Sequence, residues 1–303
     1  QQSSHIYSTY FAPRGRSRIY TLGMQIAQLY LSPFDQIIGF IGEAGSGKSV
    51  LIKGMFPGIE LTNDDDGVNV RPLPLLEQEY ETGFFTPHTY HLDIRFETGF
   101  HQLSELADAV RLAVRRGKRI IIEHFDLIYP LLGVNANLLI GVGEQIVITR
   151  PNLFGPLPQE LCDIVYPSLA YRLMAHSAED LCEYAMTQEQ MLACSHGDIR
   201  HGFVLEFNEH QPDIDIPTLE ARVNELIRQD LPIDYYDESH ILLGGAQHYC
   251  TGPRTHVRST GRIIGFRLLD HFIYDHFHKT YMLVGCVGDD SEENIRKLET
   301  IHG

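Results

Sequence analysis

The sequence predicts an α/β fold with a mostly parallel sheet in its first half and an α+β arrangement in its second half. Strand-like apolar runs alternate with helix-like segments up to about residue 150, as is typical of parallel β-α-β units. A stretch rich in proline and glycine follows at 151–158 and is typical of a linker. A chain of 303 residues is long enough for two hydrophobic cores. We therefore expect two domains, residues 1–157 and residues 158–303.

Apolar spacing and turn residues locate the elements of the first half. Helices are expected at 22–31, 50–55 and 103–116, and strands at 36–41, 89–94 and 119–123. Because strands and helices alternate, the strands should pair mainly in parallel.

The second half opens with a long helical pattern. Helices are expected at 161–186 and 216–228, with a strand at 204–207. Three late histidines, His271, His276 and His278, are expected on alternating faces of a further strand.

Composition limits the classes of function. The chain carries 24 basic and 40 acidic residues, a formal charge of −16, and this balance disfavours non-specific binding to nucleic acid. It has no apolar run long enough to cross a bilayer and no signal-like start, so we expect no membrane association and a cytoplasmic location. Its five cysteines form no CxxC pair, which argues against a disulfide framework.

One glycine-rich motif lies between a strand-like run and a helix-like run. It comprises Gly42, Glu43, Ala44, Gly45, Ser46, Gly47, Lys48 and Ser49, with Val50 next in the helix. The pattern GxxxxGK[ST] in this context is typical of a phosphate-binding loop, in which backbone N–H groups surround the phosphates of a nucleotide. We expect Lys48 to contact the outer phosphates and the Ser49 hydroxyl to bind a bridging Mg²⁺ ion. The sequence thus predicts a site for ATP or GTP with Mg²⁺.

Two carboxylates lie at the carboxyl ends of predicted strands. Asp93 and Glu123 should therefore face the edge of the sheet at which ligands bind. We expect Asp93 to bind Mg²⁺, and Glu123 either to bind the ion or to orient the water that attacks the γ-phosphate. With Lys48 they form the predicted catalytic set. The acidic segment 64–66 is expected to be a solvated turn or a further magnesium-dependent group.

Four segments of the first half occur in the order Tyr20-Thr21-Leu22-Gly23, the phosphate-binding loop, His91-Leu92-Asp93 and Ile121-Ile122-Glu123. In this order they resemble the small bacterial ATPase required for threonylcarbamoyladenosine modification of tRNA. The resemblance implies a P-loop NTPase domain that uses ATP and Mg²⁺, with Lys48, Ser49, Asp93 and Glu123 as functional positions. The chain departs from the family at His124, where the family has tryptophan.

Three segments of the second half, 203–207, 219–232 and 255–261, carry a second resemblance. In order and spacing they resemble the second additional domain of alanyl- and threonyl-tRNA synthetases and of free-standing editing proteins. The resemblance implies a zinc-like metal held by an H-x-x-x-H pair and a later C-x-x-x-H pair, and removal of a wrong amino acid from tRNA.

This chain changes the ligand set that the resemblance implies. His176 matches the first histidine of the family's ligand set, and His256 matches the last. Asp180 occupies the position of the second histidine. Gly252 replaces the family's cysteine, and Cys250 stands two residues earlier. His176, Asp180, Cys250 and His256 are chemically acceptable ligands for zinc, but a domain that keeps only the fold remains an alternative. His196, His201 and His248 are further candidates.

Three functions follow from these patterns. The first is an ATPase coupled to a tRNA- or amino-acid-related second domain. The second is a small-molecule kinase, and the third is a nucleotide-binding sensor without turnover. A protein partner is compatible with each of them.

Overall fold

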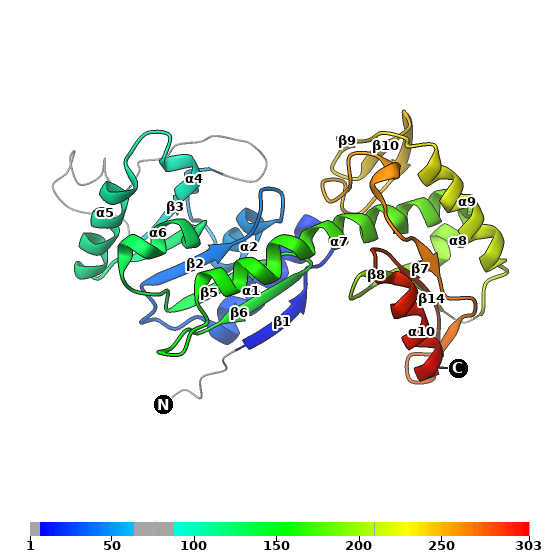
Figure 1. Ribbon diagram of the computed structural model, residues 1–303, viewed down its shortest axis with the longest axis horizontal. Helices are drawn as coiled ribbons and strands as arrows, with labels where there is room; N and C mark the ends of the chain where they lie inside the picture. Colours follow the sequence, from blue (N-terminus) through cyan, green and yellow to red (C-terminus); the bar gives the residue numbers. More distant parts are fainter. Residues whose placement is uncertain (1–6, 64–74, 76–87, 209, 303) are drawn as a thin grey trace. The chain divides into compact units, whose positions relative to one another are not determined.

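The chain forms two compact units, residues 1–169 and 170–303 (Figure 1). The computed structural model describes residues 7–63, 75, 88–208 and 210–302. The units divide inside helix α7 (Pro158–Ala185) rather than at the expected boundary after residue 157. The reason is packing, because Leu161 and Val165 of this helix are buried in the core of the first unit.

Unit 1 is an α/β layer structure. Its elements are β1 (Tyr7–Phe11), α1 (Arg16–Tyr30), β2 (Ile37–Ile41), α2 (Lys48–Met55), β3 (Thr89–Asp93), α4 (Ile94–Glu97), α5 (Leu103–Arg115), β4 (Arg119–Glu123), α6 (Phe125–Leu132), β5 (Leu138–Val142) and β6 (Gln145–Thr149). The strands form one mixed sheet in the order β1-β6-β5-β2-β4-β3. The pairs β3–β4, β4–β2 and β2–β5 are parallel, whereas β6 pairs antiparallel with both β5 and β1. The expectation of a mostly parallel sheet is confirmed for its central part.

A hydrophobic core covers each face of this sheet. Alternation along β2 directs Ile37 and Ile41 into the core that contains α5 and α6, and Ile38 and Phe40 into the core that contains α1 and α2. Each such side chain contributes about 1.5–3 kcal/mol on burial. The two layers of helices fix the central strands, and therefore the positions of the strand ends.

Helix α1 begins six residues before the expected start at residue 22. The apolar face extends one turn earlier than the sequence pattern indicated, because Ile19 is buried together with Leu22 and Ile26. Gly15 precedes the helix with a φ of 85°, a conformation that glycine adopts without strain.

Unit 2 combines helices with antiparallel sheets. Beyond the second part of α7, its elements are α8 (Gln188–Ala193), β7 (Cys194–Ile199), β8 (Gly202–Asn208), α9 (Ile216–Arg228), β9 (Ile233–Asp237), β10 (His240–Leu243), β11 (Ala246–Tyr249), the 3₁₀ turn η1 (Thr260–Arg262), β12 (Arg267–Leu268), β13 (Ile273–Asp275), β14 (Thr280–Cys286) and α10 (Ser291–His302). One sheet has the order β12-β14-β8-β7, with β13 also on β14, and a second has the order β11-β10-β9. Met174, Ala178 and Leu181 of α7 are buried in the core of this unit.

The three late histidines do not share a strand. Strand β13 spans only Ile273–Asp275, so His271 precedes it and His276 and His278 follow it. The expectation of alternating faces was therefore wrong. The Asp275 side chain accepts hydrogen bonds from the backbone N–H groups of Phe277 and His278, and this turn ends the strand.

Within the described part of the chain, none of the helices combines the length and the apolar character that crossing a bilayer requires.

Candidate functional site

The glycine-rich loop joins β2 to α2, as the motif predicted. Gly45 and Gly47 have φ values of 77° and 93°, in the region that favours glycine. A Cβ on Gly42 would lie 2.6 Å from the carbonyl oxygen of Val142, so only glycine fits there. Lys48, Ser49 and Val50 then form the first turn of α2, whose N-terminus is a favourable place for an anion.

Lys48 is buried at the base of this loop. Its Nζ donates a hydrogen bond of 2.8 Å to the Glu43 carbonyl oxygen and lies 3.8 Å from Glu123 Oε2. A buried ammonium needs such partners because its isolated charge is costly to desolvate. The loop carbonyl and the strand-end carboxylate therefore fix the side chain beneath the loop.

Glu123 is oriented from its other side by His91. The His91 Nδ1 accepts the Thr62 N–H at 3.1 Å, so Nε2 carries the proton and donates to Glu123 Oε1 at 2.9 Å. Both side chains are buried. Glu123 thus has one oxygen hydrogen-bonded to His91 and the other directed toward Lys48.

Asp93 lies beside Glu123 at the same edge of the sheet, because the parallel ladder pairs the two residues directly. Its Oδ1 accepts the Phe96 N–H at 3.2 Å and caps α4, while Oδ2 accepts from Asn63 Nδ2 at 3.0 Å. Single atoms of Asp93, Glu123 and His124 lie within 4.8 Å of one another. Two carboxylates so placed are suitable ligands for Mg²⁺, directly or through water.

His124 is the residue at which the chain leaves β4. It has a φ of 56°, an uncommon value for a residue other than glycine. Burial and the nearby charges of Lys48 and Arg95 lower the pKa of His124 to about 4. The imidazole is therefore neutral at pH 7, and the positive charges at this edge of the sheet belong to Lys48 and Arg95.

Arg95 connects the loop to the β3–α4 corner. Its guanidinium contacts the Glu43 carboxylate at 3.2 Å and 3.5 Å. The hydrogen bond and charge of Arg95 lower the pKa of Glu43, against the opposite effect of partial burial. Glu43 therefore contacts two basic residues. Its carbonyl oxygen accepts a hydrogen bond from Lys48, and its carboxylate forms an ion pair with Arg95.

The structure thus brings Lys48, Asp93 and Glu123 together, as the strand-end argument predicted. Ser49 is buried in the first turn of α2, and Val50 packs on the core. The expected acidic turn at 64–66 lies outside the described residues. Sequence reasoning assigned no contact to His91 or Thr62, although strand alternation places His91 on the same face as Asp93.

A second group of polar side chains lies in unit 2. Single atoms of Asp180, Cys250 and His256 lie within 4.8 Å of one another. His256 Nε2 is 2.5 Å from Asp180 Oδ2 and 3.7 Å from Cys250 Sγ. Carboxylate, thiolate and imidazole are all ligands of zinc, so three of the four predicted ligands meet at one point.

The tautomer of His256 is consistent with a metal ligand. Its Nδ1 lies 3.2 Å from the Pro253 carbonyl oxygen, which can only accept a hydrogen bond, so Nδ1 carries a proton. Nε2 lies 2.5 Å from Asp180 Oδ2, a hydrogen-bond distance that requires a proton between the two atoms, and a bound metal ion would take the place of that proton. A histidine that binds a metal commonly donates its other N–H to a carbonyl in this way.

The loop that carries Cys250 and His256 is fixed to helix α7. Cys250 Sγ accepts the Gly252 N–H at 3.3 Å, and the Val257 N–H donates to Ser177 Oγ at 3.0 Å. Ser177 lies three residues before Asp180, on the adjoining turn of α7. The bond from Val257 thereby holds this end of the loop close to the Asp180 carboxylate, whereas the Gly252–Cys250 bond orders the loop itself.

The fourth predicted ligand, His176, is buried in α7 but does not belong to this group. Asp180 instead forms a further group with Glu183 and His248.

Of the reserve candidates, His248 therefore joins the cluster, and His196 lies 2.7 Å from Glu183 Oε1. His201 does not join it, because it pairs with Asp290 at 2.9 Å and stacks on Tyr171.

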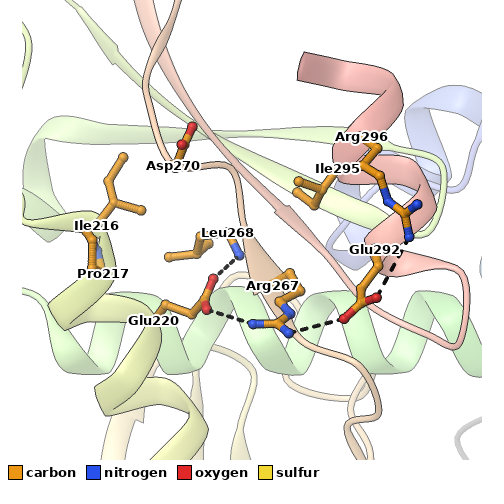
Figure 2. Close-up of a pocket in the computed structure, with 9 residues that line it drawn as sticks. All are labelled: Ile216, Pro217, Glu220, Arg267, Leu268, Asp270, Glu292, Ile295 and Arg296. Carbon is orange, nitrogen blue, oxygen red and sulfur yellow. Dashed lines mark hydrogen bonds and ion pairs between the residues drawn. The ribbon is translucent and has the colours of Figure 1, made fainter. Parts of the chain in front are cut away.

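A shallow hollow of about 370 Å³ in unit 2 contains none of the predicted site residues. It lies between α9, β12 and α10, and its lining residues are Ile216, Pro217, Glu220, Arg267, Leu268, Asp270, Glu292, Ile295 and Arg296. Arg267 contacts Glu220 at 3.4 Å and Glu292 at 3.2 Å (Figure 2). These ion pairs balance the charge of Arg267.

Comparison with known proteins finds no family model that matches this chain and no match among the curated proteins.

Proposed function

We propose that unit 1 binds ATP with Mg²⁺ and hydrolyses the γ-phosphate. The observation that supports this proposal is the position of Glu123, with Lys48 3.8 Å from one carboxylate oxygen and His91 2.9 Å from the other. A carboxylate held between an ammonium and a neutral imidazole is suited to orient a water molecule toward a phosphate above Lys48.

Each residue has a definite part in this mechanism. The loop amides and the α2 N-terminus bind the phosphates, and Lys48 neutralises the charge that develops on the outer oxygens. Asp93 and Ser49 would hold the magnesium ion, which supplies further charge neutralisation when it is bound. Glu123 orients the attacking water and receives its proton as the water oxygen bonds to the γ-phosphorus, the bond from that phosphorus to the bridging oxygen breaks and ADP leaves. His91 keeps the carboxylate in place.

We propose a metal-dependent hydrolytic site for unit 2, with Asp180, Cys250 and His256 as zinc ligands. The convergence of these three groups supports it. Following the resemblance of segments 219–232 and 255–261, its ligand would be an aminoacyl group, free or carried on tRNA. A cytoplasmic location is part of this proposal.

The decisive experiment compares Glu123→Gln with the wild-type chain. We expect ATP turnover with Mg²⁺ to fall by about 100-fold or more, whereas binding of a labelled nucleotide stays within about threefold of the wild-type value. Glu105→Gln is the matched control, because Glu105 caps α5 and glutamine also serves in a capping box.

Three outcomes would change the assignment. Unchanged turnover in Glu123→Gln would remove the role given to this residue. Nucleotide binding without turnover in the wild type would favour a sensor. ATP consumption that requires an added acceptor would favour a kinase.

A further inference from the structure

The cluster in unit 2 extends beyond the three groups that form the proposed zinc site. Glu183, Cys194 and His196 form another group in which single ligand atoms lie within 4.8 Å of one another. None of these three residues belongs to the set Asp180, Cys250 and His256. The second group offers the same types of ligand, one carboxylate, one thiol and one imidazole.

The local structure brings the side chains of Glu183, Cys194 and His196 close together. Helix α8 ends at Ala193, and Cys194 begins β7, so Cys194 and His196 are two residues apart on the strand and share a face. Glu183 reaches them from α7, with Oε1 2.7 Å from His196 Nε2 and 3.6 Å from Cys194 Sγ. A Cys-x-His pair on a strand and a glutamate on a helix thus converge from two elements.

The two groups are connected through α7. Asp180 and Glu183 lie three residues apart, and residues at this spacing are neighbours on a helix surface. Atoms of both carboxylates lie within 4.8 Å of each other and of a His248 ring nitrogen. The six ligand side chains and His248 therefore form one continuous cluster rather than two isolated sites.

We propose that unit 2 binds two transition-metal ions of the zinc class, the second held by Glu183, Cys194 and His196. Two neighbouring carboxylates with soft and imidazole ligands on either side are suited to a pair of such cations. Glu183 is buried, whereas Cys194 and His196 are partly exposed, so an ion can reach this end of the cluster from solvent. This inference goes beyond the single metal of the proposed function.

The test uses the full chain, stripped by a chelator and titrated with Co²⁺ alone. We expect two equivalents to bind, each with a thiolate-to-cobalt absorption band. Cys194→Ser and His196→Ala should each lose one equivalent and leave the other, while Cys250→Ser should lose the band of the first ion only. His240→Ala is the matched control, because His240 contacts Asp237 at 2.9 Å but belongs to none of the metal-capable groups found among the described residues.

The outcomes separate this inference from the proposed zinc site. One equivalent that is lost in Cys250→Ser but kept in Cys194→Ser would overturn the second ion and leave the first. The number of equivalents that carry a thiolate-to-cobalt band in the wild-type chain tests the inference even if a variant fails to fold, because the proposed Mg²⁺ site of unit 1 contains no thiol among its groups. Binding of no cobalt at all would overturn both proposals.

Discussion

The two sites differ in what faces their buried carboxylates. In unit 1, Glu123 lies 3.8 Å from the Lys48 ammonium, so the protein itself supplies a positive charge. In unit 2, Asp180 and Glu183 lie 2.5 Å and 2.7 Å from imidazole nitrogens and close to thiols. A lysine beneath a glycine-rich loop suits an anionic ligand, whereas converging carboxylates, thiols and imidazoles suit a cation. Under the proposed functions, Lys48 of unit 1 would contact anionic phosphates, whereas the carboxylates of unit 2 would contact a metal ion directly.

The largest expected effect concerns Lys48. Lys48→Met should lower ATP affinity by about 100-fold or more, because it removes the charge that contacts the outer phosphates. Equilibrium binding of a fluorescent nucleotide measures this change. Lys53→Met, in the last turn of the same helix, is the control. The metal content of unit 2 should stay unchanged, and a loss of metal in Lys48→Met would break the distinction between the sites.

Metal removal is expected to affect unit 2 selectively. A ligand present at 100 times its Kd stabilises the folded state by about 2.7 kcal/mol, and a chelator should remove a stabilisation of this order. Hydrogen exchange would report it as lost protection in the second part of α7 and in β11, with β2 and β4 unaffected. Equal loss in both units would show that the cation is not specific to the cluster.

A smaller effect is expected at His91. His91→Ala removes the hydrogen bond that orients Glu123, and ATP turnover should fall by about tenfold with little change in nucleotide affinity. His91→Gln should restore part of the rate, because an amide can both accept from Thr62 and donate to Glu123. If glutamine gives no recovery, His91 contributes through packing rather than by positioning Glu123.

The smallest effect concerns the pair Glu43–Arg95. Because the pKa of Glu43 is lowered in the folded chain, its charge stabilises the fold above the ordinary glutamate value of about 4.5, and this contribution is lost as the pH falls through the folded value. Both side chains are nearly half exposed, so the pair contributes less than about 1 kcal/mol. Denaturant melts of Glu43→Gln and wild type should differ at pH 7 and converge once the pH has fallen below the lowered pKa of Glu43. A constant difference would exclude the ion pair as the cause.

The sequence alone determined the first site to a large extent. The loop from Gly42 to Ser49 is a local motif, and its geometry depends on glycines that are adjacent in the chain. Asp93 and Glu123 could be added because the ends of parallel strands meet at one edge of a sheet. His91 and Thr62 required the structure, since the Thr62–His91–Glu123 chain joins three separate segments.

The second site depended far more on tertiary structure. The resemblance placed His176 in the ligand set, but the fold groups Asp180 with Cys250 and His256, and then with Glu183 and His248. These residues come from α7, β11 and the loop that follows β11, separated by up to 76 residues. The sequence could supply the residue types that bind a metal. Only the packing of the helix against the strands decided which of them share a point in space, because no local repeat fixes such distances.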